Sequence, residues 1–150
     1  MEFEGLDEAA LEALAARVAR CLEPGDVVVL RGEVGSGKTT FVRAAARSLG
    51  VEVRVTSPTY QIARAYDAVA AGGRRVTVNH LDLYRLEAFE EKDALELDDY
   101  LDPEAITLVE WAEPALGLIE NPTVVQISHE TPTTRRVSLA GPAARRMSRC

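Results

Sequence analysis

Several features that mark whole classes of proteins are scarce in this chain of 150 residues. It contains no apolar run of about 18 residues, so we expect no membrane-spanning helix. Its N-terminus is acidic, and no basic region precedes an apolar one, so we expect no export signal. Membrane proteins and secreted precursors are therefore not the classes that the sequence favours.

Positive charge is also scarce, because 17 Lys and Arg residues stand against 24 Asp and Glu residues and the formal net charge is −7. Proteins that bind nucleic acid alone are usually basic, since contacts with phosphate supply most of their affinity. We therefore do not expect this chain to bind DNA or RNA by itself.

Cysteine is the third scarcity, because only Cys21 and Cys150 are present and they lie far apart in the sequence. Two cysteines at such a distance do not imply a disulfide framework. Cys21 falls in a stretch with helical periodicity, where we expect a small buried or half-buried thiol. A reducing cytoplasm fits this cysteine content best, and we expect a cytoplasmic protein.

The size and composition predict one domain with a proper core, because 47% of the residues are hydrophobic. We assign residues 1–141 to this domain. Residues 142–150 include three arginines and no acid, and we expect them to form a flexible, frayed tail. The alternative is that this tail contacts an acidic partner or RNA.

The clearest motif is the run GEVGSGKT at residues 32–39, which has the form G-x-x-x-x-G-K-[ST]. Residues 26–31 (DVVVLR) before it are typical of a buried strand, and residues 40–49 after it are typical of a helix closed by Gly50. Strand, glycine loop and helix are the context that a phosphate-binding loop requires. The alternative is a glycine-rich turn that binds nothing, and that alternative does not need Lys-Thr at its end.

The residue types in this loop suit a nucleotide triphosphate and Mg²⁺. Gly32, Gly35 and Gly37 let the backbone wrap around phosphates and turn its N–H groups inward. Lys38 can reach the β- and γ-phosphates, and the Thr39 hydroxyl can bind Mg²⁺. The residues that we expect to contact ATP here are Glu33, Val34, Gly35, Ser36, Gly37, Lys38, Thr39 and Thr40.

The remaining elements predict an α/β fold. Asp7 can cap a helix over residues 8–22. Strand patterns cover residues 51–55, 60–66, 75–81, 105–110, 122–128 and 135–139, the last of them at an edge. Residues 60–66 and 75–81 read as an antiparallel hairpin, and residues 87–95 as a helix. The order predicts a mixed sheet of about seven strands, mainly parallel around the loop, with helices on both faces.

Two carboxylates follow predicted strands, where the sites of open α/β sheets lie. Glu110 ends residues 105–110 and could hold Mg²⁺ opposite Thr39, or it could be a solvent-exposed strand end. Asp82 could orient a water for attack on the γ-phosphate, or it could cap the next turn. His80 shares the strand face of Asp82, and we interpret it as a buried packing histidine. We therefore take Lys38, Asp82 and Glu110 as the candidate catalytic residues.

Two further sites have open alternatives. The hydroxyl of Thr59 or Ser57 could sense Mg²⁺ or the γ-phosphate, or the segment could be a plain loop. Trp111, the single tryptophan, could be a core or hinge residue beside Glu110, or an exposed anchor for a partner.

Together these motifs resemble the TsaE (YjeE) family of small P-loop ATPases. The matching pieces are residues 30–43 (LRGEVGSGKTTFVR), 57–60 (SPTY), 80–86 (HLDLYRL) and 109–111 (VEW), and the resemblance covers about residues 6–140. It implies a P-loop NTPase fold, with ATP and Mg²⁺ as ligands. It also implies slow hydrolysis that depends on TsaB and TsaD partners in forming threonylcarbamoyladenosine in tRNA, which the chain meets only indirectly.

The resemblance also implies individual roles. Lys38 and Thr39 match the phosphate and metal residues, Glu110 the metal-associated carboxylate, and Asp82 the water-positioning aspartate. Trp111 matches the tryptophan beside the site. Glu113 and Arg135 fall where the family lines the adenosine end of ATP.

Two other functions stay open at this point. A small-molecule or nucleoside kinase shares the loop but usually needs an arginine-bearing lid, and residues 82–103 are acidic with few arginines. A nucleotide-gated binding module would use ATP or ADP to switch its affinity for a partner without significant turnover.

Overall fold

The computed structural model describes residues 1–53, 55, 63–69, 73–83, 97–112 and 117–150. The predicted helix at 87–95, together with Ser57, Thr59 and Glu113, lies outside these ranges. The elements in chain order are β1 (Glu2–Leu6), α1 (Glu8–Arg20), β2 (Val27–Arg31), α2 (Lys38–Ser48), β3 (Ala63–Val69), β4 (Arg75–Asp82), β5 (Ala105–Glu110), β6 (Thr123–His129), β7 (Arg135–Ala140) and α4 (Pro142–Arg146).

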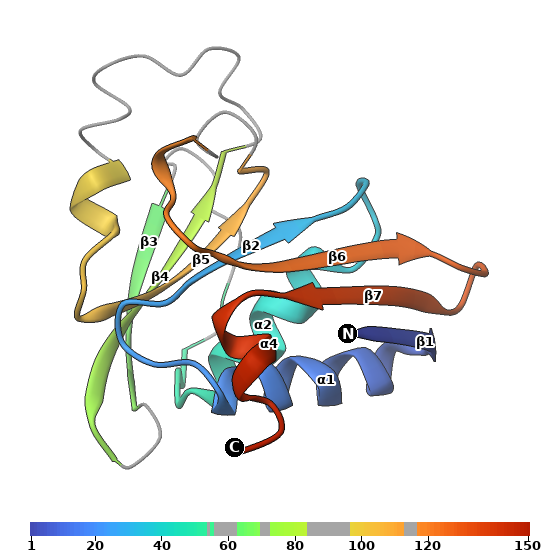
Figure 1. Cartoon of the computed structure of the whole chain (residues 1–150), viewed down its shortest axis with the longest axis horizontal. Helices are drawn as coiled ribbons and strands as arrows, with labels where there is room; N and C mark the ends of the chain where they lie inside the picture. The colour runs from blue at the N-terminus through green and yellow to red at the C-terminus, as the bar shows by residue number, and fades with distance from the viewer. Residues whose placement is uncertain (54, 56–62, 70–72, 84–96, 113–116) are drawn as a thin grey trace.

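One mixed sheet of seven strands organises the described chain, in the order β1-β7-β6-β2-β5-β4-β3 (Figure 1). The four strands β6, β2, β5 and β4 run parallel to one another at its centre. The outer pairs β1/β7, β7/β6 and β4/β3 are antiparallel. The predicted α/β class, the mixed seven-stranded sheet and the hairpin are confirmed. Parallel pairing, however, is limited to the centre.

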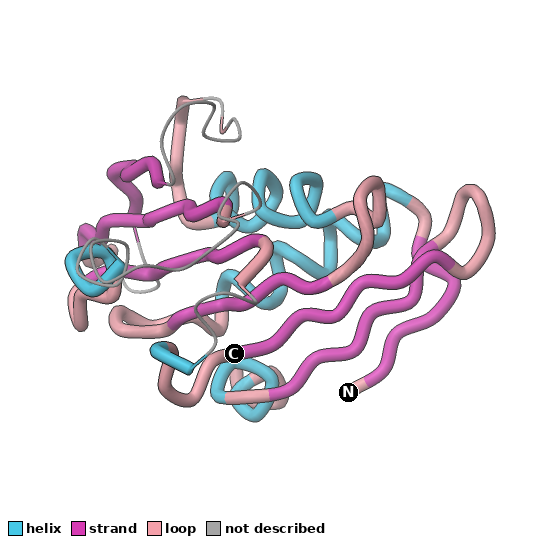
Figure 2. Tube along the Cα trace, turned by 90° about the horizontal axis from the view of Figure 1, so that it is seen from above, coloured by secondary structure: helices cyan, strands magenta, loops and turns pink. Residues whose placement is uncertain are grey.

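The sheet is buried on both faces, which is why its central strands are apolar without alternation. On β2, Val28 and Leu30 belong to the core cluster that contains α1 and α2. Val29 points the other way, into a cluster with Leu81 and Leu97. Helices α1 and α2 lie together along one face of the sheet (Figure 2). Residues 97–100 are helical, and Leu97 and Tyr100 pack in the cluster on the opposite face.

Local signals place the first two helices accurately. The carboxylate of Asp7 accepts a hydrogen bond from Ala10 N–H at 2.8 Å, and so caps α1 as predicted.

None of the described helices is both long and apolar enough to cross a membrane.

Two strand predictions are wrong. Residues 51–53 form no strand, because the Val51 N–H donates to Ala46 O at 3.1 Å and folds the chain back onto the end of α2. At the other side of the sheet, β7 is not an edge strand, because β1 pairs with it through Glu2↔Ser138 and Phe3↔Val137. That pairing joins segments more than 130 residues apart, and the sequence pattern of one segment does not reveal it.

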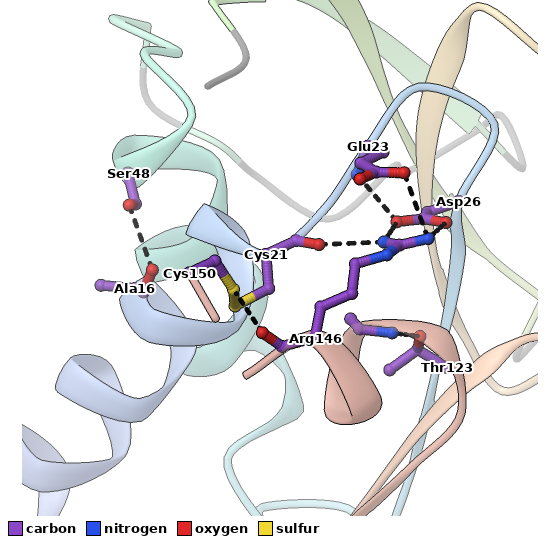
Figure 3. Close-up of a disulfide and its surroundings, with 9 residues drawn as sticks. Ala16, Cys21, Glu23, Asp26, Ser48, Thr123, Arg146 and Cys150 are labelled. Carbon is purple, nitrogen blue, oxygen red and sulfur yellow. Dashed lines mark hydrogen bonds and ion pairs between the residues drawn. A yellow bond between two sulfur atoms is a disulfide. The ribbon is translucent and has the colours of Figure 1, made fainter. Parts of the chain in front are cut away.

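The C-terminal segment is also not the frayed tail that we expected. Residues 142–146 form α4, and Ala143, Ala144 and Met147 are buried in the main core. A disulfide joins Cys150 to Cys21 at the end of α1, with 5.5 Å between the two Cα atoms (Figure 3). Cys21 is therefore not a free buried thiol. The apolar face of α4 brings together two cysteines that are 129 residues apart, and their spacing carries no sign of this.

Candidate functional site

The loop between β2 and α2 has a shape that its glycines make possible. Gly32, Gly35 and Gly37 have φ values of 152°, 77° and 114°, a region that favours glycine. A Cβ on Gly32 would lie 2.5 Å from the Ile127 carbonyl oxygen, and one on Gly37 would lie 2.8 Å from Leu11 Cδ2. Helix α2 starts directly after the loop with no side-chain cap, so its first N–H groups are available to donate hydrogen bonds to an anionic group.

Lys38 brings a nearly buried ammonium group to this loop, with 5% of the residue exposed. Its Nζ donates to Gly32 O and, at 3.2 Å, to Glu33 O. The same Nζ lies 3.6 Å from the centroid of the Trp111 ring, a cation–π contact. Trp111 has φ 58°, which is a strained conformation for a bulky residue and one that is concentrated at functional sites. The partly buried tryptophan thus lies beside Lys38 and the glycine loop.

Glu110 lies at the end of β5 and faces Thr39, the residue after Lys38. It is only 2% exposed, so its interpretation as a solvent-exposed strand end is wrong. The Thr39 hydroxyl donates to Glu110 Oε1 at 3.3 Å, and His80 Nε2 lies 2.6 Å from Oε2. Asp82 is directly opposite Glu110 in the register of β4 and β5. The ends of two neighbouring strands therefore bring both carboxylates next to the start of α2.

These groups surround one cavity of about 400 Å³ at the carboxyl ends of β2, β4 and β5. The described residues that line it are Glu33, Val34, Gly35, Gly37, Lys38, Thr39, Thr40, Asp82, Glu110 and Trp111. All of them were predicted from the sequence. A larger hollow of about 770 Å³ lies along the β3–β4 hairpin, but its described lining contains none of the candidate residues.

Ser36 and Arg135 are the two described candidates that do not line this cavity. Ser36 is 1% exposed, and its Oγ has no hydrogen-bond partner among the described residues. Arg135 reaches the loop from the start of β7, where its Nε donates to Ser36 O at 2.9 Å and one terminal nitrogen donates to Gly35 O at 3.4 Å. Arg135 therefore holds the outer side of the loop through main-chain carbonyls, a role that sequence reasoning missed.

The donor set suits a cation that is shared with a phosphate ligand. In the part of the chain that the structure describes, no group of three or more His, Cys, Asp or Glu side chains is arranged to hold a metal. Thr39 and Glu110 supply hard oxygen atoms beside a glycine cradle. Mg²⁺ typically uses such a pair together with phosphate and water oxygens, so the residues fit it.

His80 makes a side-chain contact at the site that the sequence did not predict. It is buried as expected, at 1% exposure, but it contacts Glu110 rather than only packing in the core. The available signal was its position, two residues before Asp82 on a strand that neighbours Glu110 in the sheet.

Comparison with known proteins adds a family to this geometry. The model described as "Threonylcarbamoyl adenosine biosynthesis protein TsaE" matches residues 6–137. The chain belongs to the TsaE family. The resemblance inferred from the loop and the strand-end motifs is thereby confirmed.

Individual TsaE proteins support the assignment. The chain is 40% identical to "tRNA threonylcarbamoyladenosine biosynthesis protein TsaE" of Bacillus subtilis over 67% of its length and 60% of that relative. It is 41% identical to the protein of the same name from Streptomyces coelicolor, over 69% of this chain and 68% of the relative.

A solved structure supports the fold. The crystal structure of Bacillus subtilis YdiB matches with a TM-score of 0.75 and 24% identity, over 99% of this chain and 94% of that chain. At this identity the similarity concerns the architecture alone.

Proposed function

We propose that this TsaE-family protein is a Mg²⁺-dependent ATPase with a P-loop NTPase fold, which acts with TsaB and TsaD in forming threonylcarbamoyladenosine in tRNA. The observation that carries this proposal is the cavity in which the glycine loop, Lys38, Thr39 and the two carboxylates meet. The family's name supplies the pathway.

The loop and Lys38 would bind the phosphates of ATP. Gly32 and Gly37 leave room for the backbone, and the uncapped start of α2 supplies N–H donors with the positive end of a helix dipole. The Lys38 ammonium is held at the loop by main-chain carbonyls, so it can exchange these weak acceptors for phosphate oxygens over a short distance.

Thr39 and Glu110 would hold Mg²⁺. When it is bound, this ion neutralises charge on the β- and γ-phosphates and orients them. Glu110 is suited to this task because Thr39 and His80 already contact its two oxygens, one each, and so restrict its rotation.

Asp82 would position the water that attacks the γ-phosphorus. As an acceptor at the cavity wall, its carboxylate can take a hydrogen bond from that water and orient the oxygen lone pair. The new bond joins the water oxygen to phosphorus, the bond to the β–γ bridging oxygen breaks, and ADP and phosphate leave. The proton of the water passes to the phosphate product or to Asp82.

The rest of ATP would lie beyond Trp111. We propose that Trp111 borders the nucleotide, that Glu113 and Arg135 belong to the adenosine end, and that Thr59 senses the γ-phosphate or Mg²⁺. Arg135 also donates hydrogen bonds to the loop carbonyls of Gly35 and Ser36. It would therefore also affect nucleotide binding indirectly, by holding the loop that binds the phosphates.

We propose the cytoplasm as the setting because of the family's role with tRNA, since the Cys21–Cys150 disulfide removes the argument from cysteine content. There TsaB and TsaD would raise a slow basal rate, and tRNA would be met only through their complex. Phosphate release is measured with ATP and Mg²⁺, with and without purified TsaB and TsaD. Release that the partners stimulate supports the ATPase. ADP formed only with a small acceptor would favour a kinase, and binding without turnover in every mixture would favour a nucleotide-gated module.

A further inference from the structure

His80 combines two features that a packing residue does not need. It lies on β4, on the face of the sheet that α2 covers, and is 1% exposed. Its Nε2 lies 2.6 Å from Glu110 Oε2, whereas its Nδ1 has no hydrogen-bond partner among the described residues. A buried ring nitrogen without a partner costs free energy, so an apolar residue would pack this position better.

The contact follows from the register of the sheet. Asp82 is opposite Glu110, and His80 is opposite Leu108, so the ring reaches diagonally along one face toward the end of β5. A carboxylate can only accept, so Nε2 carries the hydrogen and donates it to Oε2. The other oxygen, Oε1, is left to face the Thr39 hydroxyl at 3.3 Å.

We propose that His80 is a positioning residue, which fixes the Glu110 carboxylate so that its second oxygen is presented to the cation beside Thr39. This inference rests on the proposed function, because it needs Mg²⁺ to bind with the nucleotide. A carboxylate with one oxygen held has lost its rotational freedom before the ion arrives, and this lowers the entropic cost of binding. Partners of this kind behind a metal ligand typically change metal affinity or activity by about 10- to 100-fold.

The first test measures the binding of a non-hydrolysable ATP analogue by calorimetry at increasing Mg²⁺ concentrations. His80→Phe keeps a buried ring and removes the donor, and it should raise the Mg²⁺ concentration for half-saturation by about 10-fold or more. Analogue affinity without Mg²⁺ should stay unchanged. His80→Gln puts an N–H donor near the position of Nε2. Its Mg²⁺ concentration for half-saturation should therefore return most of the way to the wild-type value.

His129 provides the matched control, because it is the only other histidine and is exposed at the end of β6. His129→Phe should leave the Mg²⁺ midpoint at the wild-type value. The inference is overturned if His80→Phe binds with an unshifted midpoint, or if His80→Gln shifts it as much as His80→Phe does. Either result would mean that the hydrogen bond from His80 to Glu110 does not contribute to Mg²⁺ binding.

A second measurement covers the case in which His80→Phe does not fold. Nitrogen-15 NMR of the wild-type protein should show the His80 ring hydrogen on Nε2, with a downfield, slowly exchanging signal. Glu110→Ala should shift or abolish that signal and leave the exposed His129 ring unchanged. A hydrogen on Nδ1, or a His80 signal that ignores Glu110→Ala, would overturn the contact.

These readouts separate the two levels of inference. Absence of Mg²⁺-dependent nucleotide binding in the wild-type protein contradicts the proposed function. Wild-type binding together with an unshifted His80→Phe midpoint contradicts only the role of His80.

Discussion

Lys38 is an ammonium group held in a nearly buried position by carbonyl oxygens and an aromatic ring. A buried cation is costly unless strong partners surround it, and main-chain carbonyls are weaker partners than phosphate oxygens. The site therefore gains most from a ligand that carries negative charge to this point. The two strand-end carboxylates would repel such a ligand without a cation between them.

Replacing Lys38 tests this balance. Lys38→Ala should weaken ATP binding by about 10- to 150-fold, the equivalent of the 1.5–3 kcal/mol of a hydrogen bond to a charged group. Calorimetric titration of ATP with Mg²⁺ measures the change, and thermal unfolding checks the fold. Wild-type affinity in the variant would refute the site.

Asp82 should separate binding from turnover. Asp82→Asn keeps the shape and removes the charged acceptor, so nucleotide affinity should persist while phosphate release in the presence of partners slows by about 100-fold or more. If the variant unfolds instead, Asp82 has the capping role that the sequence also allowed. An unchanged rate would remove it from the mechanism.

At the scale of elements, what the sequence could reveal depended on the range of the interactions. The loop, α1 with its Asp7 cap and the strand that ends in Glu110 follow from local patterns, and the structure contains all three. Edge strand β1 and the contact of Arg135 with the loop depend on partners about 100 or more residues away. Main-chain carbonyls accept the hydrogen bonds of Arg135, and a carbonyl leaves no signature in the sequence.

Arg135 allows the loop and the adenosine pocket to be distinguished. If it acts by holding the loop, Arg135→Ala should weaken the binding of ATP and of inorganic tripolyphosphate alike, by about 10-fold. If it contacts adenosine, only ATP binding should fall. Arg136→Ala is the matched control, because Arg136 is the next residue on β7 and pairs with Glu4 and Glu130 at the surface.

At the scale of the whole molecule, both ends of the chain are fixed to other elements of the fold. The N-terminal amino group of Met1 donates to Leu139 O at 2.9 Å, and the disulfide fixes Cys150 to the end of α1. Between them, Arg146 pairs with Asp26 and donates to Cys21 O at 2.9 Å (Figure 3). Asp26 directly precedes β2, so the C-terminal segment is anchored to the strand that leads into the loop.

The stability that the contact between Arg146 and Asp26 contributes should not depend on the charge of Arg146 around neutral pH. The hydrogen bond from its guanidinium to Asp26 raises the pKa of Arg146 above the ordinary value of an arginine. A group with a raised pKa contributes its full stability below its unfolded value and loses it only as the pH rises through the folded value. For an arginine that window lies in strong alkali, so Arg146 keeps its charge throughout the neutral range.

The disulfide should contribute to stability because it closes a long loop of chain. Reduction should lower the free energy of unfolding by about 2–4 kcal/mol, since the crosslink restricts the unfolded state. Urea unfolding with and without a reductant measures the difference. The free energy of unfolding of Cys150→Ser should equal that of the reduced wild-type protein, and a reductant should not lower it further. Equal stability of the oxidised and reduced wild type would show that the crosslink contributes nothing.

The most direct measurement of the central claim is a calorimetric titration of ATP into the wild-type protein, with Mg²⁺ and then with the metal chelated. We predict saturable binding at one site, weakened when Mg²⁺ is withdrawn, and a loss of that dependence on Mg²⁺ in Glu110→Ala. Absence of heat on adding ATP and Mg²⁺, or binding that ignores both Mg²⁺ and Glu110→Ala, would contradict the account.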